Sequence, residues 1–421
     1  MIAVVFRPLS VLILLILSVK GVWADGAALS QTIILSGYRS TLVLLLIVRT
    51  FSCLLVMPVI DQGENLYLFL ALILMRVFSA KFFVAASSIS LFINFELRLI
   101  PIFLIILGWG YQTERILAGK ALFIYTAVGS VPLLVLIIYH LSFGRRVLIS
   151  NTWGFTNRSL GLLFIPVIAF LVKLPLIGVH MWLPKAHVDA PVIGSMFLAA
   201  ILLKLGGWGI LLYQDRFDRI FLATFCIALS LMGVVWVSAI CCQTLDRKTL
   251  IAFSSVIHIR FVVVGVAIGS NTSINCALAV LLSHGFSSSL AFYVVFLFYK
   301  LYNRRRLVLT KTLGSTRGLL RLVWLGTVIA VVGCPPSFNL WVEIMCYIVF
   351  LLDLRVLIKP MFFGALAAGV YGFLLIGKIY FGSDFIFKSC FHPTQLELGQ
   401  GLIGVVLTIL TSIIITIIFT L

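Results

Sequence analysis

Residues 173–209 read KLPLIGVHMWLPKAHVDAPVIGSMFLAAILLKLGGWG, and this stretch decides how the chain folds. It is almost wholly apolar, yet Pro175 and Pro184 lie on either side of Gly178. Proline removes a backbone donor and its ring clashes with the preceding helical turn, so the arrangement predicts an interrupted helix. At membrane depth, irregular backbone is tolerated only where it is buried in protein or lines a cavity. The presence of Lys173 and Lys204 in the same stretch therefore predicts a polar route inside the protein.

The whole chain has the composition of a membrane protein. Of its 421 residues, 62% are hydrophobic and only 10% are charged, and the mean hydropathy is +1.21. A bilayer core about 30 Å thick needs roughly 20 apolar residues per helix. The clearest uncharged runs of that length are residues 121–144, 220–245, 261–299, 322–342 and 398–421. Extended over the chain, this pattern predicts an all-α polytopic membrane protein with about 12–14 transmembrane helices.

Two further interruptions organise the second half of the chain. The run over residues 261–299 is long enough for nearly two crossings, and the polar segment at residues 269–272 predicts a turn inside it. Farther on, Pro335 and Pro336 precede Glu343, which predicts a second broken helix. One break with a nearby ionisable group in each half is typical of transporters built from inverted repeats. The sequence therefore predicts two inverted repeats and two broken helices.

The charge balance concerns orientation rather than a nucleic-acid partner. The chain has 31 Lys and Arg against 13 Asp and Glu, a formal net charge of +18. These basic residues lie in short connections between apolar runs, where they set the orientation of the helices in the membrane. The connection at residues 300–321 is predicted to lie on the inner side. The 8 cysteines include no Cys-x-x-Cys and are predicted to be small buried hydrophobes, with no metal site.

Ionisable residues recur inside the apolar runs. Each costs roughly 2.5–3.5 kcal/mol at the bilayer centre, so a chain that only filled lipid would exclude them. The residues concerned are Glu96, Lys173, Lys204, Glu343, His180, His258 and His284. Burial disfavours the charged form of a lysine and a nearby carboxylate favours it, so a lysine beside a movable glutamate can take up and release a proton. Any one of them alone is equally well a structural residue, but their recurrence favours a proton relay.

The quoted stretch closely resembles the signature of the antiporter-like membrane subunits of respiratory NADH:ubiquinone oxidoreductase, or complex I. Shorter matches support it: FE at 95–96, LIP at 99–101, GWG at 108–110, QTER at 112–115, LIAFSSVIH at 250–258, SHG at 283–285 and PPSFNL at 335–340. The resemblance extends from about residue 95 to residue 343. It agrees with the polytopic membrane protein with a proton relay that the apolar runs, helix breaks and ionisable residues already favour.

The resemblance implies roles for individual residues. In that family the carboxylate at the position of Glu96 pairs with the lysine at the position of Lys173. Lys204 and His284 correspond to the central relay, and Glu343 to the outlet group of the second half. Further relay candidates are His180, His187 and His258. The chain itself is expected to bind no cofactor and no metal, whereas NADH, FMN, iron–sulfur clusters and ubiquinone are expected in other subunits.

The resemblance also implies a setting. Expected partners are the other membrane subunits of respiratory complex I, including neighbouring antiporter-like subunits, together with lipids and no nucleic acid. The expected location is the mitochondrial inner membrane. Residues 1–90 are predicted to form N-terminal transmembrane helices, residues 91–215 and 216–357 the two half-channel repeats, and residues 358–421 the C-terminal helices.

Some positions depart from the family pattern. Asp189 stands where Glu is usual, in a predicted loop. Arg98 and Arg260 are cations at places that are usually uncharged. Arg98 follows Glu96 by two residues, and residues two apart point to different faces of a regular helix, so simple helical spacing does not pair them.

Three other readings stay open from the residues. An Mrp-type cation/proton antiporter subunit shares the same Glu and Lys pattern, although the wording at 182–187 and 108–110 favours the respiratory subunit. An inactive structural membrane protein is a second alternative. A redox enzyme is a third, which the lack of a dinucleotide-binding glycine motif and of iron–sulfur cysteine spacing disfavours. Residues 7–24 resemble a signal peptide, but a retained first helix is predicted because so many spans follow.

Overall fold

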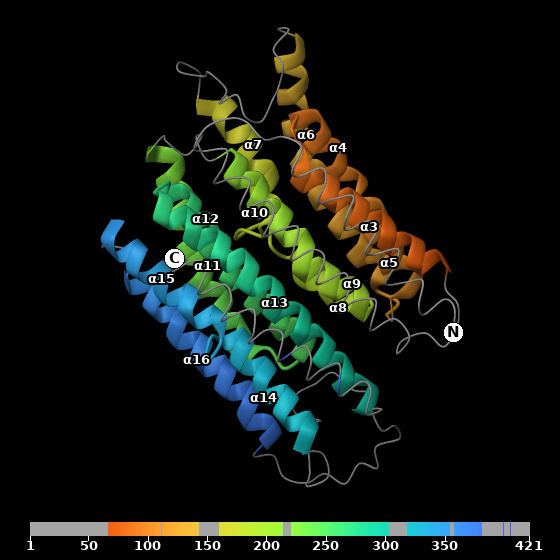
Figure 1. The fold of residues 1–421 in the computed structure, drawn as a ribbon, viewed down its shortest axis with the longest axis vertical. Helices are drawn as coiled ribbons and strands as arrows, with labels where there is room; N and C mark the ends of the chain where they lie inside the picture. Colours follow the sequence, from red (N-terminus) through yellow and green to blue (C-terminus); the bar gives the residue numbers. More distant parts are fainter. Residues whose placement is uncertain are drawn as a thin grey trace.

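The computed structural model describes residues 66–110, 112–142, 160–213, 220–302, 318–353 and 358–380, together with Gly399 and Val405. Over these residues the chain is a bundle of helices without a β-strand (Figure 1). Seven helical segments there are long and apolar enough to cross a membrane. The predicted all-α polytopic membrane fold is confirmed. The helices predicted before residue 66, and nearly all of the run at residues 398–421, lie outside the described residues, so the count of about 12–14 stays a prediction.

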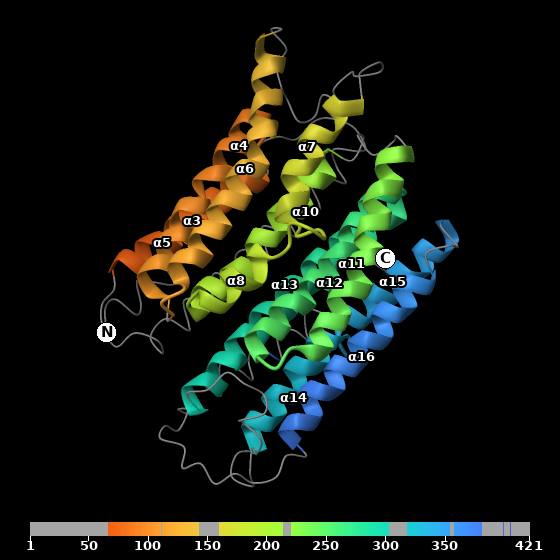
Figure 2. The same ribbon diagram turned by 180° about the vertical axis from the view of Figure 1, so that it is seen from behind.

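The first group of helices forms one side of the bundle (Figures 1 and 2). It consists of α3 (Leu66–Val84), α4 (Ser88–Leu97), α5 (Leu99–Trp109) and α6 (Arg115–Ser142). Only 33% of the apolar span of α6 is buried, against 44% for α3 and for the span that joins α4 to α5. The exposed remainder is mostly apolar, as a surface that meets lipid or another membrane subunit requires.

The middle group of helices contains residues 173–209, the stretch with the predicted helix break. It comprises α7 (Leu160–Lys173), α8 (Trp182–Asp189), α9 (Val192–Phe197), a π-helical turn η1 (Leu198–Leu202) and α10 (Leu203–Leu212). The span from Val192 to Leu212 is 94% buried. Segments α8 and α9 continue into η1 and α10, and together they run between the first group and the rest of the bundle (Figure 1).

The third group starts with α11 (Ile220–Gln243), α12 (Arg247–Ile268) and α13 (Asn271–Tyr302). The turn predicted at residues 269–272 is confirmed, because Gly269 ends α12 with a φ of 76° that other residues seldom adopt. The apolar spans of α12 and α13 are 94% and 100% buried, so these two helices form the centre of the molecule.

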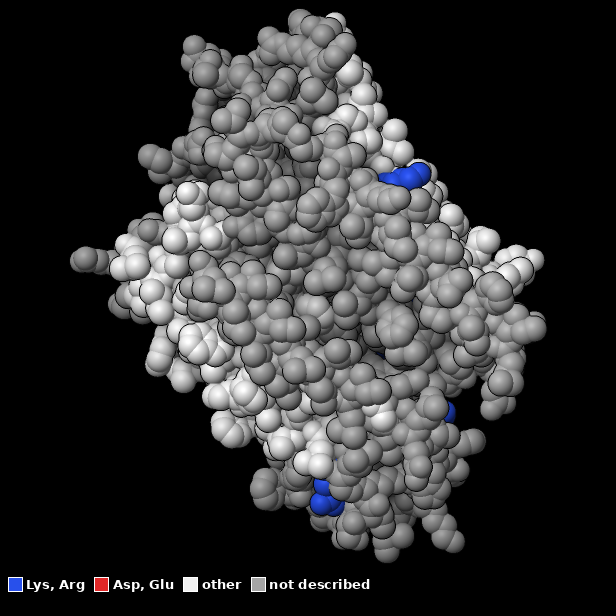
Figure 3. Space-filling view, viewed as in Figure 1, with Lys and Arg blue, Asp and Glu red and all other residues white. Residues whose placement is uncertain are grey.

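Three more helices close the far side of the bundle: α14 (Gly318–Val332), α15 (Phe338–Asp353) and α16 (Ile358–Tyr380) (Figure 2). On the face drawn in Figure 3, basic side chains appear at only a few places and no acidic side chain shows among the coloured residues.

Glycines in α10 permit its close contact with neighbours on two sides. A Cβ at Gly209 would collide with the ring of Phe170 on α7, and a Cβ at Gly207 would lie 2.7 Å from a methyl group of Leu281 on α13. Small residues at such crossings allow helix backbones in membranes to approach one another. Helix α10 is therefore held between α7 and α13, which fixes the position of Lys204.

The substitution Gly209→Ala is expected to destabilise the protein by about 1–3 kcal/mol, because the added methyl group overpacks the Phe170 site. The measurement is the thermal stability of the solubilised protein in its native assembly. Gly369→Ala is the matched control, since a Cβ at that helical position meets nothing within 4 Å. Equal losses in the two variants would contradict the tight crossing of α7 and α10.

Candidate functional site

Lys173 is the last residue of α7 and lies beside Glu96 of α4. Its side chain is 0% exposed, and its Nζ lies 3.4 Å from Oε1 of Glu96. The same Nζ lies 3.2 Å from the centre of the Phe95 ring, a cation–π contact. The structure thus brings the first two predicted site residues together although they are 77 positions apart in the sequence.

The predicted interruption of the helix follows Lys173 directly. Helix α7 ends there and α8 begins at Trp182, with irregular backbone between them. Gly178 in this segment has a φ of 92°, which favours glycine. The indole Nε1 of Trp182 donates a hydrogen bond of 3.1 Å to the carbonyl of Val172, so the two helical pieces stay joined across the break. The first predicted broken helix is therefore observed.

Lys204 lies one residue into α10 and its side chain is 0% exposed. Its Nζ donates a hydrogen bond of 2.6 Å to the carbonyl of Ala199 in the π-helical turn η1. In an α-helix that carbonyl would be occupied by an amide four residues on, but a π-turn changes the pattern and makes carbonyls available. Residues 198–202 are all apolar, so the sequence gives no local indication of this π-helical turn, and it was not predicted.

His187 of α8 is fully buried and lies within electrostatic range of both Lys204 and Lys248. Its ring stacks on that of Phe292, with centroids 4.6 Å apart and planes at 8°. Lys248, at the start of α12, donates hydrogen bonds of 2.9 and 2.7 Å to the carbonyls of Val188 and Ala190, and so caps the end of α8. This capping lysine was predicted only as a residue that sets orientation.

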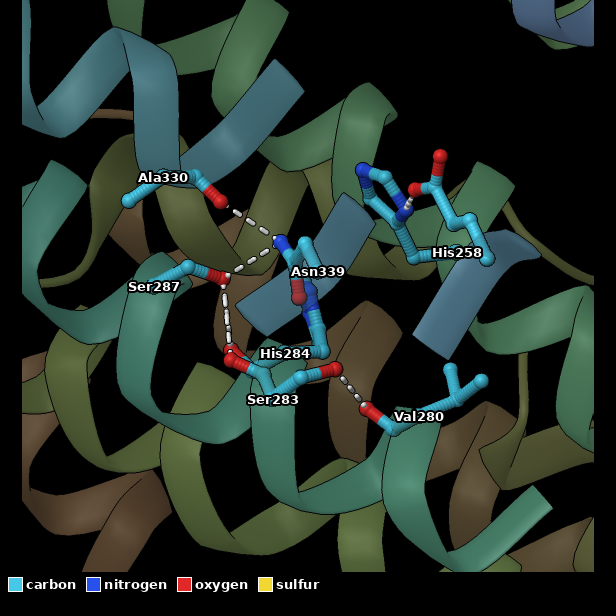
Figure 4. Close-up of polar contacts among 8 residues, drawn as sticks. His258, Val280, Ser283, His284, Ser287, Ala330 and Asn339 are labelled. Carbon is cyan, nitrogen blue, oxygen red and sulfur yellow. Dashed lines mark hydrogen bonds and ion pairs between the residues drawn. The ribbon is translucent and has the colours of Figure 1, made fainter. Parts of the chain in front are cut away.

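The second cluster joins α12, α13 and α15. His284 lies within electrostatic range of Lys204, and its ring centroid is 5.8 Å from that of His258. Nδ1 of His258 lies 2.9 Å from Oε1 of Glu343, the dashed contact beside His258 in Figure 4. Lys204, His284, His258 and Glu343 therefore follow one another from the buried centre of the molecule to a carboxylate that is 13% exposed.

The second predicted broken helix is also observed, between the end of α14 at Val332 and the start of α15 at Phe338. Asn339 just beyond it donates hydrogen bonds of 2.7 Å to the carbonyl of Ala330 and 3.1 Å to Oγ of Ser287 (Figure 4). A cavity of about 70 Å³ adjoins these groups and is lined partly by Ser283, Ser287 and Asn339. At roughly 10–15 Å³ per water, it has room for a few water molecules. These polar residues were not among the site residues predicted from the sequence.

Three other residues singled out in the sequence, namely His180, Arg260 and Asp189, are buried as well. His180, a further relay candidate, is buried in the break between α7 and α8 and lies within electrostatic range of Arg260, which is likewise buried. The Arg260 guanidinium occupies the space in which a side chain at position 233 would lie, so Gly233 makes room for it. Asp189 was predicted in a loop, but it is the last residue of α8 and is 6% exposed, because α8 continues through it.

Within residues 66–110, 112–142, 160–213, 220–302, 318–353 and 358–380, no group of three or more His, Cys, Asp or Glu side chains could hold a metal ion. The described site is built from amines, imidazoles and carboxylates, which are groups that exchange protons.

Comparison with known proteins identifies the family. Residues 85–367 match the family described as NADH:quinone oxidoreductase/Mrp antiporter, TM. The chain is 41% identical over 266 residues to NADH-ubiquinone oxidoreductase chain 4 of Artemia franciscana, a match that covers 63% of this chain and 68% of that one. It is 40% identical over 275 residues to the chain 4 of Struthio camelus, covering 62% of this chain and 59% of that one.

Solved structures share the fold. A chain of respiratory complex I from Thermus thermophilus with bound NADH superposes with a TM-score of 0.80 at 21% identity, covering 89% of this chain and 80% of that chain. A chain of the Mrp complex from Dietzia sp. gives a TM-score of 0.80 at 13% identity, covering 90% and 81%. These likenesses concern the fold, whereas the sequence matches confirm the resemblance noted above. The chain belongs to the membrane family of NADH:quinone oxidoreductase and Mrp antiporter subunits, and its relatives there include NADH-ubiquinone oxidoreductase chain 4 proteins.

Proposed function

We propose that the chain is a proton-translocating membrane subunit of respiratory complex I, of the chain 4 type. The observation that carries the proposal is the buried series of ionisable groups from Glu96 to Glu343, in a chain about 40% identical to chain 4 proteins. Lipid would not tolerate these groups, so they face a route through the protein. Both helix breaks adjoin that route.

The first step of the proposed mechanism takes place at the Glu96 and Lys173 pair. Their 3.4 Å separation is longer than the 2.7–2.9 Å of a strong charge-assisted hydrogen bond, so the pair is loose enough to open. When the carboxylate moves away, the Lys173 ammonium is left in buried surroundings beside the Phe95 ring, without its counter-charge. Lys173 then passes its proton onward, and the return of Glu96 prepares it to take up another.

The later steps use Lys204 and the second cluster. A proton reaching Lys204 is held at its Nζ beside the Ala199 carbonyl. Lys204 in turn lies within electrostatic range of His284. Imidazole can accept a proton at one nitrogen and donate from the other, which suits His284 and His258 to the central positions. His258 delivers the proton to the carboxylate of Glu343, 2.9 Å away. Water in the cavity beside Ser287 and Asn339 would extend this part of the route.

The energies involved are adequate for pumping. One charge that crosses about 100 mV requires about 2.3 kcal/mol. Removing one partner of a buried ion pair costs about 3–5 kcal/mol. The free-energy change on opening and closing a pair such as Glu96 and Lys173 is therefore large enough to drive a proton across the membrane. The coupling to electron transfer would arrive from other subunits, through movements of these helices.

The proposal includes a division of labour. The redox cofactors, namely NADH, FMN, iron–sulfur clusters and ubiquinone, belong to other subunits, and this chain conducts protons without carrying electrons. Its exposed apolar faces on α3 and α6 meet lipid and neighbouring membrane subunits, including antiporter-like ones. We place the chain in the mitochondrial inner membrane, as a chain 4 type subunit of NADH:ubiquinone oxidoreductase.

The Mrp-type antiporter is the second candidate, favoured by the shared family and by the fold likeness to the Mrp complex. Identification of the proteins that co-purify from mildly solubilised membranes separates the two. We expect NADH-oxidising subunits in the same particle, and no NADH oxidation by the isolated chain. Recovery of a cation/proton antiporter assembly without NADH-oxidising subunits would overturn the assignment to complex I.

A further inference from the structure

The span that carries Glu96 is locally broken at Arg98. Helix α4 ends at Leu97, α5 begins at Leu99, and the Arg98 amide bonds to the carbonyl of Glu96 instead of a carbonyl four residues back. Pro101 explains the break, because it lacks an amide hydrogen and its ring would clash with the carbonyl four residues before it, that of Leu97. The rule that residues two apart face different ways holds for a regular helix, and this segment is not one.

The Arg98 side chain is buried without a hydrogen bond. It is 1% exposed, and none of its Nε, Nη1 and Nη2 atoms has a hydrogen-bond partner among the residues that the structure describes. It lies on the buried side of the span, as do Phe95 and Ile102, which are three residues before and four residues after it. A buried cation with no partner is strongly unfavourable, and a guanidinium matches a carboxylate with two parallel hydrogen bonds.

A suitable carboxylate is adjacent. Oε1 of Glu96 accepts a hydrogen bond of 3.4 Å from Lys173, and the Glu96 side chain is 25% exposed, so it has room to turn. Arg98 lies within electrostatic range of both members of this pair. The local cluster therefore holds two buried cations and one carboxylate. Lys173 contacts Glu96 and the Phe95 ring, whereas Arg98 has no hydrogen-bond partner within the described part of the chain.

We propose that Arg98 is the second partner of Glu96, and that the carboxylate alternates between Lys173 and Arg98 about the break made by Pro101. The inference rests on the proposed function, since it describes how the Glu96 and Lys173 pair opens. When Glu96 binds Arg98, Lys173 is left buried without its counter-charge, the state from which it passes on its proton. Arg98 is a positioning residue that acts through Glu96 and carries no proton itself, because a guanidinium does not deprotonate in proteins.

The test is the number of protons translocated per NADH oxidised by the assembled complex in sealed vesicles, for variants at position 98. Arg98→Met and Arg98→Gln remove the charge, and we expect each to lower the ratio about fivefold or more, the size of a typical coupling between two sites. Arg98→Lys keeps a cation that the carboxylate can reach, and we expect it to restore most of the ratio. Because the ratio is taken per NADH oxidised, it does not depend on the yield of complex.

Leu97→Met is the matched control for disturbance of this turn, since Leu97 precedes Arg98 directly in the chain and is 37% exposed. We expect it to leave the ratio unchanged. A normal ratio in either neutral variant at position 98 overturns the role of Arg98, as does a failure of all three variants to assemble, which would assign Arg98 to folding. If Lys173→Met also pumped normally, the proposed function itself would fail, so the two failures are distinguishable.

Discussion

Exchanging Lys173 for methionine is expected to abolish proton translocation while the complex still assembles. Methionine has a similar length and fills the fully buried site, but it has no proton to exchange and no charge to hold Glu96. A positioned acid or base typically contributes about a hundredfold or more to rate, so a loss of at least that size is expected. Proton uptake by sealed vesicles during NADH oxidation measures it, and native electrophoresis measures assembly.

The control for Lys173→Met is Lys120→Met, which removes an exposed lysine of α6. It changes the net charge of the chain by the same amount, so a shared effect would indicate a general loss of charge. We expect normal translocation from the control. Normal translocation from Lys173→Met in an assembled complex would remove Lys173 from the route.

The substitution Lys204→Arg is expected to be nearly as damaging, although it keeps the positive charge. Arginine stays protonated in proteins, so it can occupy the site beside the Ala199 carbonyl but cannot pass a proton to His284. We expect the rate of proton translocation to fall by about a hundredfold, again measured as proton uptake by sealed vesicles during NADH oxidation.

Lys120→Arg is the matched control for Lys204→Arg, since it makes the same exchange at an exposed position. Lys204→Met separates the roles of charge and proton, because it lacks both. Equal losses in Lys204→Arg and Lys204→Met would assign the function of Lys204 to proton transfer. Retained translocation in Lys204→Arg would show that a fixed charge suffices there.

Features of the fold that follow from local chemistry were predictable from sequence. Pro175 and Pro336 remove backbone donors, and both broken helices occur where these prolines stand. Gly269 likewise ends α12 in the predicted turn. The inverted repeat stays a prediction, as do the boundaries of the domains at residues 90, 215 and 357.

Contacts between side chains on different helices could not be predicted from the sequence in the same way. Nothing near His258 in the sequence indicates that its partner is Glu343 on α15, because that contact depends on how α12, α13 and α15 pack. The π-helical turn before Lys204 has no local signal either, since residues 198–202 are all apolar. Family resemblance supplied the Glu96 and Lys173 pair, but not the capping role of Lys248 or the burial of the Arg98 guanidinium.

The central claim is that the buried acids and bases line a hydrated passage inside the protein. A density map of the assembled complex that resolves ordered water tests it most directly. We expect Lys173, Lys204 and His284 to point inward, with ordered waters that link them and continue to Glu343. Side chains turned toward lipid, or a dry apolar gap that separates them, would contradict a proton route through this chain.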